Sequence, residues 1–173
     1  MRPAILAVLV LMALPSGAAA TATVRCDQRA EPGGPRPTAK EVRAARRSSV
    51  VLPYLTIWGL RRATSASFGP HHHRWKAGLS VRNYRAVTVR VATRDRGWLA
   101  LRYEPEGGAA AAVRFVPCPP GTRRFSDGRP LGRETGWAGE FVVARAGCAT
   151  LLVRRAGARR STRVRAGFGV RCR

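Results

Sequence analysis

The chain has 173 residues, 32 of them basic and 9 acidic, and its formal net charge at pH 7 is +23. All of the basic residues are arginine except Lys40 and Lys76. A hydrophobic content of 45% excludes a fully disordered chain, and the length is too short for two ordinary domains. Collagen and heptad periods are absent from the sequence, and the composition points to no particular reaction.

The first twenty residues follow the order of a secretory signal peptide. Arg2 provides a short positive start, Ala4–Leu14 is an apolar run, and Ala18–Ala20 offers the small residues of a cleavage site. The run is shorter than the about 20 residues that a spanning helix needs. We therefore predict a cleaved signal peptide over 1–20 and no transmembrane segment in the mature chain, with an uncleaved anchor as the alternative. The predicted location is secreted, extracellular or associated with the cell wall.

Residues 21–48 are predicted to form a disordered linker. The segment 27–37 is rich in proline and glycine, which disfavour regular structure. Residues 39–47 would suit two helical turns, but they have almost no apolar face to pack on a core. We therefore expect this helix to be frayed and the folded domain to cover 49–173.

From residue 50 onward, short apolar runs alternate with turn residues, as is typical of β-strands. In the segment 84–93, Val87, Val89 and Val91 fall on one face and Arg90 on the other. Seven strands of this kind are predicted, over 51–58, 84–93, 98–103, 111–117, 140–144, 149–154 and 162–171. This spacing favours an all-β fold, an antiparallel β-sandwich of immunoglobulin-like layout, with a small closed barrel as the alternative.

A hairpin is expected between two of these strands. Residues 94–97 (Arg-Asp-Arg-Gly) have the composition of a tight turn, because aspartate and glycine suit turn backbone. The flanking strands would then be neighbours in one sheet. In the second strand, Leu99, Leu101 and Tyr103 would fall on one face, and Arg102 on the opposite face.

The chain has four cysteines: Cys26, Cys118, Cys148 and Cys172. An even number in an exported chain predicts two disulfides, and the spacing is not that of a zinc site. We favour Cys118 with Cys148, which would staple two strands around a loop, and Cys26 with Cys172, which would tie the N-terminal segment to the last strand. All three connectivities remain open at the level of sequence.

Several motifs carry a family likeness. They are Trp75-Lys76, Val87-Val89-Val91, Gly97-Trp98-Leu99 with Leu101, Val113-Phe115-Cys118, Trp137-Gly139-Phe141, Cys148 and Cys172. In these motifs, over about residues 50–173, the chain resembles a group of uncharacterised exported proteins from high-GC actinobacteria. The resemblance implies an exported, disulfide-bearing, β-rich domain, and it implies no activity and no functional residue.

Five arginines lie opposite the apolar faces of their predicted strands: Arg90, Arg102, Arg114, Arg163 and Arg165. If these strands share a sheet, the arginines form a basic plane that can pair phosphates or carboxylates through two parallel hydrogen bonds. Trp75, between Arg74 and Lys76, is predicted to be an exposed binding platform. The alternative is that GC-rich coding and polar strand exteriors account for the arginines.

Other chemistry is weakly represented. The run His71–His73 suits a metal poorly, because adjacent side chains diverge in an extended segment. Glu104 and Glu106 are a close carboxylate pair but bracket a turn. Nucleophile and metalloprotease motifs are absent from the sequence. We therefore predict no enzyme activity, no cofactor and no metal.

The sequence thus predicts an exported, non-enzymatic domain that binds anionic cell-wall or lipid polymers through an arginine-rich face. The alternative is a structural or protein-interaction module of the cell envelope that binds no polymer. Nucleic acid is not expected as the natural partner of an exported protein, although a charge of +23 would attract DNA in vitro.

Overall fold

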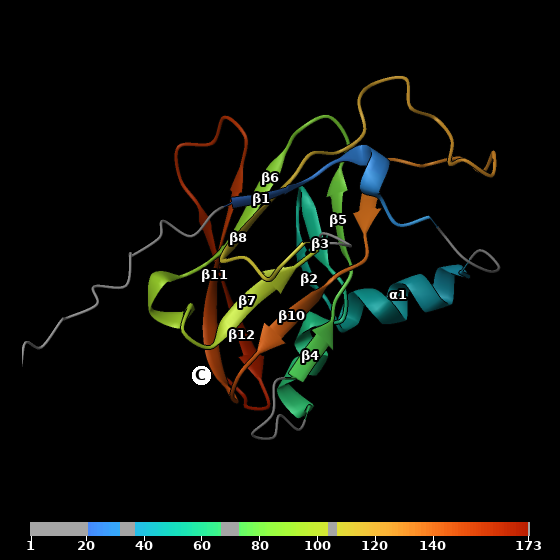
Figure 1. Ribbon diagram of the computed structural model, residues 1–173. Helices are drawn as coiled ribbons and strands as arrows, with labels where there is room; N and C mark the ends of the chain where they lie inside the picture. Colours follow the sequence, from blue (N-terminus) through green and yellow to red (C-terminus); the bar gives the residue numbers. More distant parts are fainter. Residues whose placement is uncertain (1–20, 32–36, 67–72, 104–106, 173) are drawn as a thin grey trace, which may run out of the picture.

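The computed structural model describes residues 21–31, 37–66, 73–103 and 107–172. In this part of the chain, twelve strands form three sheets, accompanied by one α-helix and three short 3-10 helices (Figure 1). The predicted all-β class is confirmed at this level. The expected signal peptide over 1–20 lies outside the described residues, as do His71, His72, Glu104 and Glu106. None of the described helices combines the length and hydrophobicity that spanning a bilayer requires.

Most of the paired strands are antiparallel. The strands are β1 (Thr21–Val24), β2 (Val50–Leu52), β3 (Leu55–Ile57), β4 (His73–Lys76), β5 (Leu79–Arg82), β6 (Val87–Val91), β7 (Leu99–Arg102), β8 (Ala112–Phe115), β9 (Glu134–Trp137), β10 (Glu140–Val143), β11 (Gly147–Arg155) and β12 (Thr162–Phe168). The helices are α1 (Ala39–Arg47), η1 (Cys26–Gln28), η2 (Leu60–Ser65) and η3 (Thr93–Asp95). The sheet orders are β1-β8-β6-β11-β12, β4-β10-β7 and β2-β3-β5-β9, and only the β1–β8 pair is parallel.

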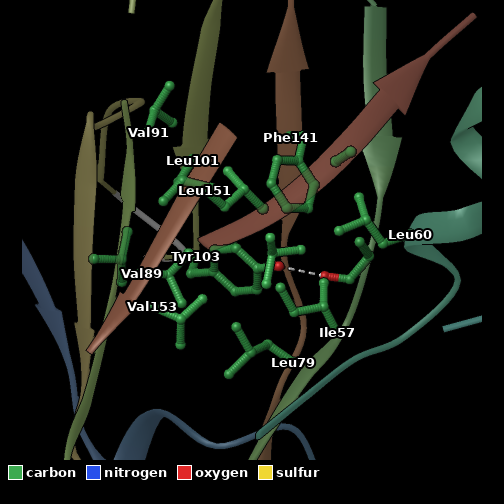
Figure 2. Close-up of a cluster of buried hydrophobic side chains, with 14 of the residues drawn as sticks. Ile57, Leu60, Leu79, Val89, Val91, Leu101, Tyr103, Phe141, Leu151 and Val153 are labelled. Carbon is green, nitrogen blue, oxygen red and sulfur yellow. Dashed lines mark hydrogen bonds between the residues drawn. The ribbon is translucent and has the colours of Figure 1, made fainter. Parts of the chain in front are cut away.

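One hydrophobic core receives side chains from all three sheets (Figure 2). The alternation expected in 84–93 is present, because Val87, Val89 and Val91 are buried and Arg90 is exposed. Tyr103 lies inside this core, and its hydroxyl donates a hydrogen bond to the carbonyl oxygen of Ala77 at 2.6 Å. Burial raises the pKa of Tyr103, so the hydroxyl remains a donor, and the bond joins the residue after β7 to the short connection between β4 and β5.

The prediction of a hairpin at 94–97 is wrong. β6 pairs with β8 and β11 in the five-stranded sheet, whereas β7 pairs with β10 in the three-stranded sheet. Helix η3 carries the chain from one sheet to the other. Asp95, only 5% exposed, holds this crossing because its carboxylate accepts a hydrogen bond from the backbone N–H of Thr150 at 2.8 Å. Aspartate and glycine suit a sheet-changing turn as well as a hairpin.

The strand expected over 51–58 is divided into β2 and β3, which pair with each other. The division falls at Pro53 and Tyr54, because proline has no N–H to donate to a sheet ladder. β4, β5 and β9 were not among the seven predicted strands. Of these, β4 lies in the three-stranded sheet, and β5 and β9 are two of the strands of the four-stranded sheet.

The segment expected as a linker contains β1, η1 and α1 in its described parts, 21–31 and 37–48. A capping box begins α1: the Glu41 carboxylate accepts a hydrogen bond from the Thr38 backbone N–H at 2.6 Å, and Thr38 Oγ1 accepts one from the Glu41 N–H at 3.3 Å. These bonds satisfy helix donors that would otherwise lack partners. The helix start is thus defined without a large apolar face.

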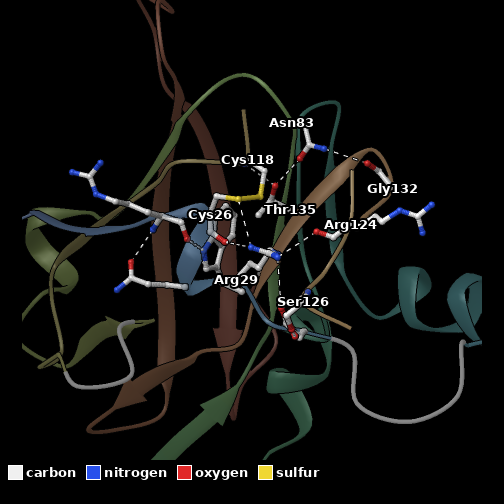
Figure 3. Close-up of a disulfide and its surroundings, with 12 residues drawn as sticks. Cys26, Arg29, Asn83, Cys118, Arg124, Ser126, Gly132 and Thr135 are labelled. Carbon is white, nitrogen blue, oxygen red and sulfur yellow. Dashed lines mark hydrogen bonds and ion pairs between the residues drawn. A yellow bond between two sulfur atoms is a disulfide. The ribbon is translucent and has the colours of Figure 1, made fainter. Parts of the chain in front are cut away.

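All four cysteines form disulfides, but the favoured pairing is wrong. The pairs are Cys26–Cys118, drawn in Figure 3, and Cys148–Cys172. The parallel pairing of β1 with β8 brings Cys26 beside Cys118, and this pairing could not be read from alternation within one strand. Cys148 lies on β11 next to β12, whose end leads directly to Cys172.

Candidate arginine-rich binding face

Four of the five arginines predicted to form a basic plane lie on the outward face of the five-stranded sheet. They are Arg90 on β6, Arg114 on β8, and Arg163 and Arg165 on β12, and all four are exposed. Their positions alternate with buried residues such as Val89, Val113 and Val164, which face the core. The alternation within each strand therefore identified the outward side chains, and the sheet order brings them together.

A fifth arginine, Arg154 on β11, completes this surface. Thr88 of β6 is directly opposite Arg114 on one side and Arg154 on the other. Neighbouring strands are about 4.8 Å apart, so arginines that flank one strand are separated by about 10 Å. We name this surface the arginine face and define it as Arg90, Arg114, Arg154, Arg163 and Arg165.

Two depressions on the arginine face are lined largely by arginines. One, of about 620 Å³, is lined by Arg94, Arg163 and Arg165. The other, of about 330 Å³, is lined by Arg114, Arg154 and Arg155. On β11, Thr150 and Leu152 line the first depression and Arg154 and Arg155 line the second, so the two depressions follow each other along the strand and share no lining residue.

Little negative charge opposes these arginines. Asp95 contacts the sheet at Thr150, and its Oδ2 already accepts the Thr150 N–H, with Arg94 Nε 3.8 Å away. Within the described residues, Arg90, Arg114 and Arg163 form no ion pair with a carboxylate. Arginines about 10 Å apart are separated by roughly the screening length of physiological salt, about 8 Å, so their positive potentials overlap. The arrangement can hold several anionic groups at once.

Arg102 and Trp75, also predicted as binding residues, lie away from the arginine face. Arg102 is on β7 in the three-stranded sheet, where its Nη1 lies 3.6 Å from Oε1 of Glu140. The same oxygen lies 3.5 Å from Nε of Arg74, so this carboxylate is shared by two arginines. Trp75 is half-buried and packs against the core from β4, opposite Phe141. Arg102 was misplaced because the hairpin that would have put β7 beside β6 does not form.

A second feature escaped the sequence analysis: a cleft of about 1000 Å³ beneath α1. It lies between α1, the four-stranded sheet and the loop between β8 and β9, and its apolar walls include Val42, Trp58, Phe125 and Leu131. A second hollow of about 850 Å³ continues along α1 and shares Val42, Phe125 and Leu131 with the first. In Figure 1, α1 lies on the side of the molecule away from the five-stranded sheet.

A chain of hydrogen bonds crosses the floor of this cleft. Trp58 Nε1 donates to Ser80 Oγ at 2.9 Å, and Ser80 Oγ donates to Glu134 Oε2 at 3.0 Å. The other oxygen of Glu134 lies 4.0 Å from Nη2 of Arg46 on α1. The chain joins β9 and β5 to the helix. Because its members are far apart in the sequence, no local spacing signals it.

Comparison of the chain with protein-family models, with curated proteins and with solved structures found no match.

Proposed function

We propose that the protein is an exported, non-enzymatic domain that binds anionic polymers of the cell envelope through its arginine face. The observation that carries this proposal is the gathering of arginines from β6, β8, β11 and β12 on one side of one sheet. Guanidinium groups pair bidentately with phosphates and carboxylates. Cell-wall phosphates, acidic glycans and anionic lipid headgroups all present such groups.

A polymer suits this face better than a small anion does. The two arginine-lined depressions share no lining residue, so a single small ion would engage one of them only. A chain with repeated charges can engage both depressions, and each further contact is then formed at a high effective concentration. Bound polymer would also relieve the repulsion among neighbouring arginines.

Export is part of the same proposal. It is supported by the signal-peptide pattern over 1–20, and the two disulfides suit an oxidising compartment. The resemblance to exported actinobacterial proteins agrees with it. For the layout we retain the immunoglobulin-like sandwich as a proposal, supported by sheets that share one core.

A ligand panel tests the proposed function. The full chain, with both disulfides formed, would be added at about 150 mM salt to a cell-wall phosphate polymer, to anionic vesicles and to neutral vesicles of matched size. We expect saturable binding to the wall polymer or to the anionic vesicles and none to the neutral vesicles. Absence of binding to both anionic ligands would contradict the proposal and favour the structural or protein-interaction module.

A further inference from the structure

We propose that the cleft beneath α1 binds a single-chain amphiphilic anion, that is, an acyl or alkyl chain that ends in a carboxylate or a phosphate. This cleft is separate from the arginine face, and the inference does not rest on the proposed polymer binding. It rests on three properties of the cleft: apolar walls, an arginine rim and the internal pairing of the carboxylates around it.

The walls supply an apolar surface for a hydrocarbon chain. From α1, Val42 and Ala45 line the cleft, and their spacing puts them on one side of the helix. Trp58 lies on the floor, while Phe125 and Leu131 come from the opposing loop. No residue of α1 is buried, so this side of the helix lacks the covering that an apolar stripe normally receives.

The rim is basic. Arg43, Arg46, Arg82 and Arg133 line the two connected hollows. Among the described residues, Arg43, Arg82 and Arg133 have no carboxylate partner. Arg82 and Arg133 are exposed, so their guanidinium groups can meet an anionic headgroup at the mouth of the cleft.

The carboxylates that line the same cleft are already occupied by internal partners. Glu41 accepts hydrogen bonds from the backbone N–H and the hydroxyl of Thr38 at 2.6 and 2.8 Å. Glu31 accepts from the backbone N–H of Ser126 at 3.1 Å and from its hydroxyl. Glu134 accepts from Ser80 Oγ. The hydrogen bonds lower the pKa of Glu41 and of Glu31, so both stay charged but engaged. An anion therefore fits the cleft better than a cation does.

The size and the floor also favour a chain over a sugar. A volume of about 1000 Å³ is at the upper end of ordinary ligand pockets, which span about 300 to 1000 Å³, and the adjoining hollow lengthens it along α1. A saccharide would need unengaged polar groups on the floor, but Trp58 Nε1 donates to Ser80 Oγ and Ser80 Oγ donates to Glu134. The apolar walls are left to contact hydrocarbon.

The test uses probes of one chain length and different headgroups, below their micelle-forming concentrations. Dodecanoate carries a carboxylate headgroup and dodecyl phosphate a phosphate headgroup. Dodecyltrimethylammonium tests the sign of the headgroup charge, and butyrate tests the need for a long chain. By titration calorimetry of the full oxidised chain, we expect saturable one-to-one binding of at least one twelve-carbon anion. Dodecyltrimethylammonium and butyrate should bind at least about ten-fold more weakly. Equal binding of the cation, or no saturable binding of either anion, would overturn the proposal.

Paired variants place the site. Val42→Glu should weaken binding of the anion by about ten-fold or more, because it puts a carboxylate in the apolar wall, where it disfavours the hydrocarbon and repels the anionic headgroup. Ala44→Glu, on the exposed opposite side of α1, should leave the affinity unchanged. Arg82→Gln with Arg133→Gln should also weaken it, and Arg47→Gln with Arg123→Gln, outside the cleft, should leave it unchanged. If V42E binds like the wild type, the cleft is not the site.

One further variant separates this proposal from the proposed function. Arg90→Glu with Arg163→Glu alters the arginine face and leaves every residue of the cleft in place. It should lose polymer binding and retain dodecanoate or dodecyl phosphate binding. Loss of the amphiphile in this variant would show that the anion binds the arginine face instead, and would overturn the cleft assignment.

Discussion

Arg90 on β6 and Arg163 on β12 flank Leu152 of β11, and all three side chains point outward from the five-stranded sheet. The two arginines come from strands that are far apart in the sequence and are separated by about 10 Å in the sheet. Because neither has a carboxylate partner in the described part of the chain, their charges reinforce each other on this surface.

Reversing the charge of this pair tests the arginine face directly. In Arg90→Glu with Arg163→Glu, we expect affinity for an anionic wall polymer to fall about ten-fold or more, because a charge-assisted hydrogen bond contributes about 1.5 to 3 kcal/mol. The matched control is Arg47→Glu with Arg123→Glu, which changes the net charge equally at exposed positions outside the face. Equal losses in the two variants, measured by calorimetry, would mean that net charge alone governs binding.

The two disulfides should stabilise the fold unequally. Cys26–Cys118 closes 92 residues and Cys148–Cys172 closes 24, and the two loops do not overlap. In the loop-entropy description, replacing the first pair by serine should lower the free energy of unfolding by about 1 kcal/mol more than replacing the second. Urea unfolding of the two double variants measures this difference. A larger loss for the shorter loop would contradict it.

Gly139 is required by the close approach of Tyr103. A Cβ built at Gly139 would lie 2.1 Å from Cδ1 of the Tyr103 ring, so Gly139→Ala forces the ring away and strains its hydrogen bond to Ala77. We expect a loss of about 2 kcal/mol in stability, as for overpacking in a core. Gly97→Ala is the control, because nothing lies within 4 Å of its added Cβ. If thermal unfolding shows that the melting temperatures of the two variants fall equally, this explanation is contradicted.

Strand alternation correctly predicted which arginines point outward, but it did not predict which strands lie next to one another. The repeat of Val87, Val89 and Val91 correctly assigned Arg90 to the opposite side of its strand. Alternation is a local property of one strand, however, and strand pairing is a long-range property. Arg102 was therefore assigned to the correct side of its own strand but to the wrong sheet, and the cysteine pairing failed for the same reason.

The cleft could not be predicted from the sequence. Its walls come from Val42, Trp58, Phe125 and Leu131, which share no local pattern. One signal was present and was not used: threonine at position 38 followed by glutamate at position 41 is the spacing of a capping box. This spacing indicates the start of α1 even though the helix has little apolar surface of its own.

The capping box makes α1 sensitive to acid. The backbone N–H and hydroxyl of Thr38 hold the pKa of Glu41 below its ordinary value of 4.5. Because the folded-state pKa is lowered, the stabilisation is complete above the ordinary value and is lost as the pH falls through the lowered pKa. An NMR titration should show the Glu41 carboxyl and the first α1 amides changing together below that value. Thr38→Ala should move the Glu41 midpoint upward, and a wild-type midpoint at or above 4.5 would contradict the prediction.

In the proposed function, the arginine face selects an anionic envelope polymer over other polyanions. A salt series on the full oxidised chain, with a wall phosphate polymer and duplex DNA as competing ligands, measures this selectivity. We expect the polymer to stay bound at about 150 mM salt while DNA is released, and Arg90→Glu with Arg163→Glu to remove this difference. If the polymer and DNA dissociate together in the wild type, the charge is unselective and the proposed selectivity is contradicted.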